Sequence, residues 1–219
     1  ASESNARRWT ELAEAATAPV GALNKQMLKM VGSGADVASG DGDDAVTLVA
    51  DPGLKLKVTG AGGRASVSDI PDVAMKAYTR AERVLELSDP ACGLRWWVLA
   101  AIGRVESNHG QYQGVTLADD GFGSRPIRGV ALDGRGDVAK VVDTDGGALD
   151  GDETFDRAMG PMQFIPETWE AVGVDADGDG ERNADNIFDA AVGAGVYLCS
   201  GGGDLGNPAA LREALHRYN

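Results

Sequence analysis

The stretch LAAIGRVESNHG, residues 99–110, constrains the fold of this chain more than any other part of the sequence. Apolar residues at helical spacing run up to it and through it, and they predict one continuous apolar face formed by Leu94, Trp97, Val98, Ala101, Ile102 and Val105. Glu106 comes directly after this face, and the Ser, Asn and Gly residues that follow it are typical of a helix end. The sequence therefore predicts a half-buried helix that ends with a carboxyl group at the rim of its apolar side.

Two features of this position favour a raised pKa for Glu106. Apolar neighbours disfavour the carboxylate anion, and so does the negative end of the helix dipole. A carboxyl group that stays protonated near neutral pH is what general-acid catalysis at a glycosidic oxygen requires. The alternative is a solvated glutamate at a helix end, and this stretch alone does not separate the two interpretations.

Apolar residues recur at helical spacing in four further segments, over residues 70–85, 166–172, 187–198 and 208–218. Residues 111–153 differ, because they are rich in Gly and Asp and show no sustained period. A connection of that length is typical of a functional or a disordered loop. The acidic run from Asp143 to Asp152 within it is interpreted as turns. The pattern as a whole predicts a mainly α fold.

Residues 1–69 are predicted to form an N-terminal appendage, and residues 70–219 the main domain. Within the appendage, residues 5–31 have helical patterning, and residues 45–60 alternate in part around a DPG turn, which indicates a possible β-hairpin. The role of the appendage stays open between a stalk, a partner surface and part of the core.

Charge and length exclude some classes of partner. The chain has 219 residues and a formal net charge of −14 at pH 7, so it has no basic surface for nucleic acid or for an anionic membrane. No apolar run approaches the length of a membrane span, so no transmembrane segment is predicted. His109 and His216 have no partners at metal-ligand or triad spacing, and we assign His216 to the surface and His109 at most to the rim of a site.

The two cysteines, Cys92 and Cys199, leave two possibilities open. They are either two buried free thiols or, in an exported protein, a single disulfide that closes the helical core.

The segment DADGDGERNADNIFD, residues 175–189, has the spacing of a calcium loop. Asp175, Asp177 and Asp179 alternate before a glycine, and Glu181 stands where EF-hand loops supply a backbone carbonyl. The twelfth position departs from the pattern, because Asn186 replaces the usual glutamate. The sequence predicts an EF-hand-like loop with a structural Ca²⁺, and the alternative is an acidic turn that binds no ion.

The stretch AAIGRVESNHG, followed by DETFDRAMGPMQFIPETWEAVGVDADGDG and then RYN, resembles the lytic murein transglycosylases of the lysozyme superfamily. The resemblance is greatest to the membrane-bound lytic transglycosylase B type and its actinobacterial relatives, and it covers roughly residues 70–219. It implies an α+β lysozyme-like fold, with a small irregular β element and a long acidic loop over the cleft.

The resemblance also implies a reaction. Such enzymes cleave the β-1,4 bond between N-acetylmuramic acid (MurNAc) and N-acetylglucosamine (GlcNAc) in peptidoglycan and leave a 1,6-anhydroMurNAc end. Glu106 matches the single catalytic residue, which acts first as acid and then as base on the muramyl 6-hydroxyl. We therefore expect an exported protein of the cell envelope, cell wall or extracellular space that binds glycan strands, with no organic cofactor and with no protein partner indicated.

Other site residues follow from the same resemblance. It implies that Gly160 lets the backbone approach the sugar and that Asp189 closes the calcium loop. It assigns substrate contacts to Thr154, Gln163, Tyr197, Tyr218 and Asn219.

Two rival functions stay open at this point. The first is a lysozyme-type muramidase of the same fold, which would need a second carboxylate such as Asp119, Asp120 or Asp152. The second is a calcium-stabilised module that binds the cell wall without turnover.

Overall fold

The computed structural model describes residues 69–136 and 138–218 of the protein. Apart from its last residue, the predicted appendage over residues 1–69 lies outside this part of the chain, with its helical segment and possible hairpin. Asn219 lies outside it too. The proposed domain boundary at residue 70 therefore stays a prediction.

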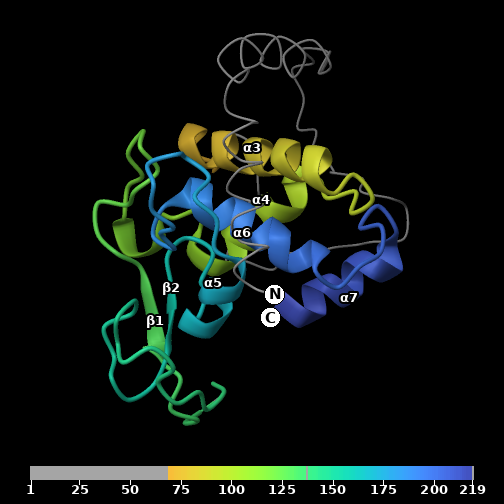
Figure 1. Ribbon diagram of the computed structural model, residues 1–219. Coiled ribbons are helices and arrows are strands. Elements are labelled where there is room, and N and C mark those ends of the chain that lie inside the picture. Colours follow the sequence, from red (N-terminus) through yellow and green to blue (C-terminus); the bar gives the residue numbers. More distant parts are fainter. Residues whose placement is uncertain (1–68, 137, 219) are drawn as a thin grey trace, which may run out of the picture.

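Within the described residues, α-helices dominate and one small sheet accompanies them (Figure 1). The α-helices are α3 (Asp72–Ser88), α4 (Trp96–Ser107), α5 (Pro166–Val172), α6 (Ile187–Cys199) and α7 (Pro208–Tyr218). The other elements are a short 3-10 helix, η2 (Tyr112–Gly114), and the antiparallel strands β1 (Arg128–Ala131) and β2 (Arg157–Met159). The prediction of a mainly α fold with a small β element is confirmed.

Helix α6 lies at the centre of the helical body, with α3, α4, α5 and α7 all in contact with it. Nearly every side chain of α6 is buried, which agrees with a segment that is apolar on all sides. Its glycines permit close packing: a side chain at Gly195 would collide with Leu85 of α3 and with Leu94. The core is therefore built around one small-residue helix that its neighbours enclose.

The buried face of α4 differs from the predicted one. Leu99 and Ile102 are buried as part of the core, but Ala101 is exposed and Val105 is 71% exposed. The helix turns its Gly103 side inward, where a Cβ would collide with the hydroxyl of Tyr78. Glycine carries no apolar signal in a periodicity count, and this is why the sequence misplaced the centre of the buried face.

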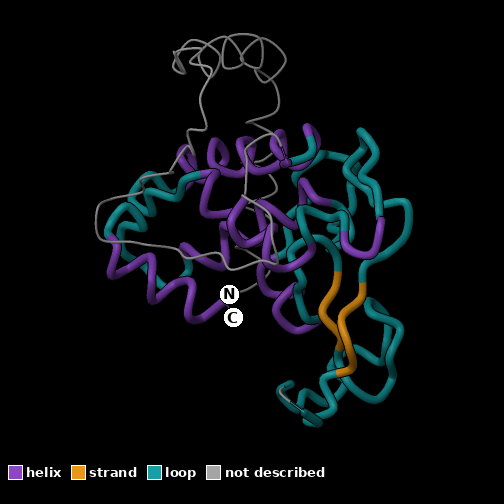
Figure 2. Tube along the Cα trace, turned by 180° about the vertical axis from the view of Figure 1, so that it is seen from behind, coloured by secondary structure: helices purple, strands orange, loops and turns teal. Residues whose placement is uncertain are grey.

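The Gly- and Asp-rich segment that follows α4 contains β1 in addition to turns, and the acidic run from Asp143 to Asp152 within it forms turns, as predicted. Asp143 begins one turn, with its Oδ1 accepting hydrogen bonds from the backbone N–H groups of Asp145, Gly146 and Gly147. The chain between β1 and β2 extends beyond the end of the two strands, away from the helices (Figures 1 and 2).

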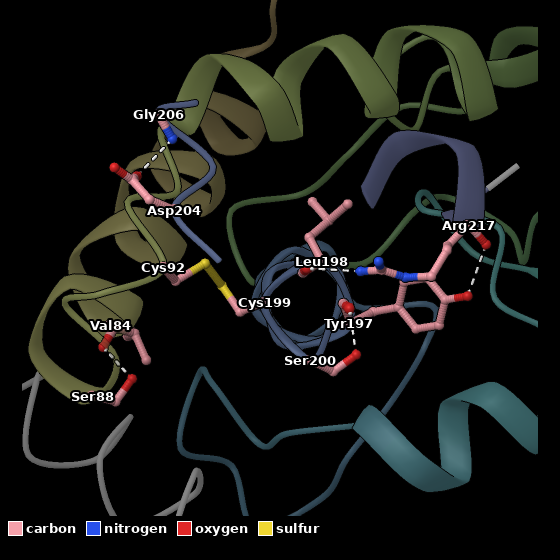
Figure 3. Close-up of a disulfide and its surroundings, with 10 residues drawn as sticks. All are labelled: Val84, Ser88, Cys92, Tyr197, Leu198, Cys199, Ser200, Asp204, Gly206 and Arg217. Carbon is pink, nitrogen blue, oxygen red and sulfur yellow. Dashed lines mark hydrogen bonds between the residues drawn. A yellow bond between two sulfur atoms is a disulfide. The ribbon is translucent and has the colours of Figure 1, made fainter. Parts of the chain in front are cut away.

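A disulfide joins Cys92, after the end of α3, to Cys199, the last residue of α6 (Figure 3). The two cysteines are 107 residues apart in sequence, and their Cα atoms lie 5.5 Å apart. The disulfide alternative is thus confirmed and the alternative of two free thiols is wrong. Among the helices of the described residues, none is long and apolar enough to cross a membrane.

Candidate active site

Glu106 lies in the last turn of α4 and is partly buried. Its carboxyl group makes no hydrogen bond or ion pair with any of the described residues. Ile102, Gly103 and Ser107, on the same side of the helix, are buried. Burial raises the pKa of Glu106 above its ordinary value. A carboxyl group without a cation beside it and with a raised pKa is suited to donate a proton.

The end of α4 is tied to a distant part of the chain through Ser107. This serine is 1% exposed, and its hydroxyl donates a hydrogen bond of 2.6 Å to the carbonyl of Pro161. The same oxygen accepts a 2.7 Å hydrogen bond from the backbone N–H of Gly110. Ser107 therefore connects α4 with the GPMQF segment, residues 160–164. In the sequence, only the resemblance indicated that these two segments lie together.

The backbone after α4 adopts two left-handed conformations in a row, at Asn108 with φ 53° and at His109 with φ 60°. Non-glycine residues rarely take such angles, so surrounding contacts must hold them. Arg104 donates a 2.6 Å hydrogen bond to the Asn108 side chain. On the other side, the Nδ1 atom of His109 lies 3.1 Å from the hydroxyl of Tyr78, in a buried hydrogen bond.

His109 does not reach the rim of the site, the outermost position that the sequence allowed for it, because the residue is only 3% exposed. Burial lowers the pKa of His109 to about 4, and the charge of Arg104 lowers it in addition. The imidazole is therefore neutral near pH 7 and serves the packing behind the end of α4. His216 is exposed, as predicted.

The GPMQF segment forms a tight turn directly after β2. Met159 and Phe164 exchange backbone hydrogen bonds of 2.8 and 3.1 Å across it. Gln163 is left-handed, with φ 54°, and its Nε2 donates a 2.8 Å hydrogen bond to the carbonyl of Gly160. Gly160 has φ 71°, and a Cβ there would collide with the carbonyl of Ala184. Residues 175–189 are called the acidic loop from here on. The close contact with this loop explains why position 160 is a glycine, in addition to the approach of a sugar that the resemblance implies.

Aromatic side chains connect the same turn to the two C-terminal helices. The hydroxyl of Tyr218, on α7, donates a 2.9 Å hydrogen bond to the carbonyl of Met162. The rings of Tyr197 and Tyr218 lie 5.5 Å apart between centroids, edge to face, and the ring of Phe164 lies 6.0 Å from that of Tyr218. Burial raises the pKa of Tyr218 well above its usual value, and the nearby charge of Glu106 raises it further. Tyr218 is thus close to both the turn and Glu106.

Thr154 is not joined to this group by any hydrogen bond. It is exposed in the turn before β2, where its backbone N–H donates a 3.0 Å hydrogen bond to Asp152.

The acidic loop brings together three of its predicted ligands. Carboxylate oxygens of Asp175, Asp177 and Asp189 all lie within 4.8 Å of one another, whereas Asp179 and Glu181 are exposed and lie outside this cluster. Both oxygens of Asp189 accept loop N–H groups, among them that of Ala176 at 2.7 Å and that of Asn183 at 2.9 Å. Burial raises the pKa of Asp189 to about 7.

Asn186 has a different role from the ligand whose place it takes in the EF-hand pattern. Its Oδ1 accepts a 2.9 Å hydrogen bond from the N–H of Phe188, so it caps the N-terminus of α6. Its Nδ2 donates to the carbonyl of Asp120 at 3.0 Å and to Asp177 Oδ2 at 2.6 Å. An Asn directly before a helical stripe is a capping signal, and the sequence could have revealed this role.

An ion pair that no motif indicated joins the acidic loop to the sheet. Arg128 on β1 makes two hydrogen bonds to the carboxylate of Asp185, at 2.6 and 2.9 Å, and a third to the carbonyl of Leu149 at 3.0 Å. With the Gly160 contact, this pair places the acidic loop directly behind the GPMQF turn.

The contacts of Ser107, Tyr197 and Tyr218 thus join the end of α4, the GPMQF turn and the two C-terminal helices. Residues 154–216 match the family model described as "Transglycosylase SLT domain". The matched segment contains the GPMQF turn, the acidic loop and Tyr197, while α4 with Glu106 precedes it. The match supports a peptidoglycan-cleaving lytic transglycosylase of the lysozyme-like superfamily, and with it a location in the cell envelope or outside the cell. Comparison with curated proteins gave no significant match, and neither did comparison with solved structures.

Proposed function

We propose that the protein is a lytic transglycosylase of the membrane-bound lytic transglycosylase B type, as in its actinobacterial relatives. It cleaves the β-1,4 bond between MurNAc and GlcNAc and leaves a 1,6-anhydroMurNAc end. The observation that carries this proposal is the partly buried carboxyl group of Glu106, which has no ion-pair or hydrogen-bond partner among the described residues. Ser107 joins it to the Gln163 turn of the matched transglycosylase segment.

In this reaction one carboxyl group performs both proton transfers. Glu106, whose protonated form burial favours, donates its proton to the bridging oxygen as the glycosidic bond breaks. The resulting carboxylate then removes the proton of the muramyl 6-hydroxyl, whose oxygen attacks the anomeric carbon of the same sugar. No water enters the product, and the proton that Glu106 gave up is replaced.

The surroundings of Glu106 favour this reaction over hydrolysis by two carboxylates. Two of the acids that a muramidase could use are engaged elsewhere: Asp152 pairs with Arg157 at 2.8 Å, and Asp120 accepts a 3.0 Å hydrogen bond from the N–H of Phe122. Burial is the cause of the raised pKa of Glu106. A two-carboxylate mechanism requires a second carboxylate within about 10 Å of the first.

Gln163, Tyr197 and Tyr218 are the proposed substrate contacts on the Glu106 side. The amide of Gln163 offers a donor and an acceptor for sugar hydroxyl and N-acetyl groups. The hydroxyls of Tyr197 and Tyr218 donate their protons to backbone carbonyls, so they offer acceptors to the sugar. Thr154 and Asn219 are also proposed substrate contacts, and for these two residues only the resemblance supports the proposal.

Digestion of purified peptidoglycan tests the proposal. Mass spectrometry of the released fragments is expected to find anhydro ends, lighter than reducing ends by one water. Glu106→Gln is expected to lower the release by at least about a hundredfold, because the amide cannot donate the proton. Glu213→Gln, an exposed change on α7, serves as the matched control.

Three other results would contradict parts of the proposal. Reducing ends in place of anhydro ends would favour the muramidase. Unchanged release by Glu106→Gln would remove Glu106 as the acid. Binding of sacculi by the unaltered protein without any release would favour the non-catalytic module.

We further propose that Asp175, Asp177, Asp179, Asp189 and the backbone carbonyl of Glu181 hold a structural Ca²⁺. The donor set fits this ion, because hard cations take several oxygens and the Asp175, Asp177 and Asp189 carboxylates already converge. Asp189 supplies the closing carboxylate, since Asn186 is used as a helix cap. The ion would neutralise the loop that packs behind the GPMQF turn.

Calorimetric titration of metal-stripped protein with calcium tests this second proposal. Heat of binding and a higher melting temperature are expected. Neither effect at millimolar calcium would count against the site.

A further inference from the structure

Arg80, in the middle of α3, carries a guanidinium group with unusual surroundings. Its Nε and Nη2 atoms are buried and have no hydrogen-bond partner within residues 69–136 and 138–218. The guanidinium carbon lies 6.0 Å from the centre of the Phe188 ring, in the first turn of α6. Phe188 stands between Asn186, which caps α6, and Asp189, the closing carboxylate of the acidic loop. Arg80 therefore faces the beginning of α6 beside this loop.

Burial of such a group without partners costs free energy unless a nearby field offsets it. The field here comes from the acidic loop. Burial lowers the pKa of Arg80, and the charges of Asp177, Asp189 and Asp175 raise it. None of these carboxylates forms an ion pair with Arg80, since every one of the described ion pairs within 4.0 Å joins other residues. The interaction acts through space and leaves the carboxylate oxygens to the loop.

We propose that Arg80 is the fixed counter-charge of the acidic loop: it stabilises the loop without calcium and weakens calcium binding. The inference rests on the calcium site proposed above. Three convergent carboxylates repel one another, and a cation beside them reduces that repulsion. The same cation repels an arriving Ca²⁺, which carries two positive charges. Arg80 would thus make the loop bind calcium more weakly than the same loop without this charge.

Removal of the charge from α3 tests the inference, with a matched control on the same helix. Arg80→Met keeps an apolar stem against Phe188 and removes the cation. Arg83→Met removes the same charge from an exposed ion pair with Glu86. In calorimetric titration of metal-stripped protein, Arg80→Met is expected to bind calcium on the order of tenfold more tightly than the unaltered protein. Arg83→Met is expected to bind with unchanged affinity.

Melting in chelator provides a readout that does not depend on enzyme activity. Arg80→Met is expected to melt at a lower temperature than Arg83→Met in chelator, and the difference is expected to shrink in saturating calcium. A variant that folds only with calcium would support the inference too, because calcium then supplies the missing positive charge. A variant that is unfolded under both conditions would overturn it, because a packing role alone explains that result.

The outcomes separate this inference from the calcium site. If the unaltered protein binds calcium and Arg80→Met binds it equally or more weakly, the inference is overturned and the site stands. If neither protein binds calcium, the proposed site is wrong and the inference falls with it.

Discussion

The ionised form of Glu106 lowers the stability of the folded protein. Its carboxyl group is partly buried beside the end of α4 and has no cation among the described residues to offset the loss of water. Because burial raises its pKa, the ionised form is less favourable in the folded chain than in the unfolded one. The penalty is absent below the unfolded pKa, near 4.3, and it develops as the pH rises through the folded value.

We predict that Glu106→Gln stabilises the protein at pH 8 while it removes catalysis. Gln is neutral at every pH, so the variant avoids the penalty that the carboxylate incurs. The melting temperature is expected to rise by roughly 2 °C at pH 8 and to change little at pH 4. Scanning calorimetry at both pH values measures this, with exposed Glu213→Gln as the control. Equal shifts at the two pH values would contradict the explanation by burial.

His109 gives the opposite dependence on pH. Its folded pKa, about 4, lies below the unfolded value of 6.5, so the folded chain resists protonation. The stability that the neutral imidazole contributes is complete above pH 6.5 and is lost as the pH falls toward 4.

We predict that His109→Asn makes the free energy of unfolding less dependent on pH between 7 and 4.5. The expected reduction in that dependence is on the order of 2 kcal/mol over this range. Asn tolerates the left-handed backbone at this position, although the hydrogen bond to Tyr78 is lost and the variant is less stable at pH 7. Urea unfolding at several pH values measures the effect. His216→Asn, at an exposed position, is expected to leave the profile unchanged.

At the scale of elements, the sequence predicted the helices well because their ends carry strong local signals. Pro166 begins α5 and Pro208 begins α7, and both helices have the predicted bounds. The buried face of α4 was less predictable, since Gly103 is where Tyr78 packs and a glycine has no hydropathy to reveal it. Arg80 was missed for a related reason: a single arginine on an amphipathic helix looks like any solvated charge until α3 is placed against the acidic loop.

The acidic loop is an element whose single residues can be tested. We predict that Asp189→Asn weakens calcium binding by at least about a hundredfold, because the closing carboxylate is lost. In chelator the variant is expected to change little in stability, because two effects oppose each other. The buried negative charge is gone and the amide oxygen can still accept the N–H of Ala176, but the N–H of Asn183 loses the oxygen that accepts it.

Glu181→Gln is the matched control for this change. Glu181 is exposed and is expected to bind calcium only through its backbone carbonyl. The Glu181→Gln variant should therefore bind calcium with an affinity close to that of the unaltered protein. Calorimetry measures both affinities. A large loss with Glu181→Gln and none with Asp189→Asn would reverse the proposed ligand roles.

At the scale of the whole molecule, the candidate site depends on contacts between segments far apart in sequence. Ser107 reaches Pro161, Tyr218 reaches Met162, and Arg128 reaches Asp185. None of these contacts has a local period or spacing, and so the residues alone could not predict them. The resemblance identified the segments that meet, and the structure supplies the hydrogen bonds by which they do so.

The disulfide is the covalent counterpart of these contacts, and it provides a prediction for the whole chain. It closes a loop of 107 residues that contains α4, the sheet, the acidic loop and most of α6. In the chain-entropy model, a cross-link of this span lowers the entropy of the unfolded state by an amount worth roughly 4–5 kcal/mol. The variant Cys92→Ala/Cys199→Ala is therefore expected to unfold at a clearly lower urea concentration than the oxidised protein. The unaltered protein, reduced with dithiothreitol, separates the effect of the cross-link from that of the lost sulfur atoms. If the oxidised protein, the reduced protein and the double variant unfold at the same urea concentration, the disulfide contributes no stability and packing around α6 alone holds the helical body together.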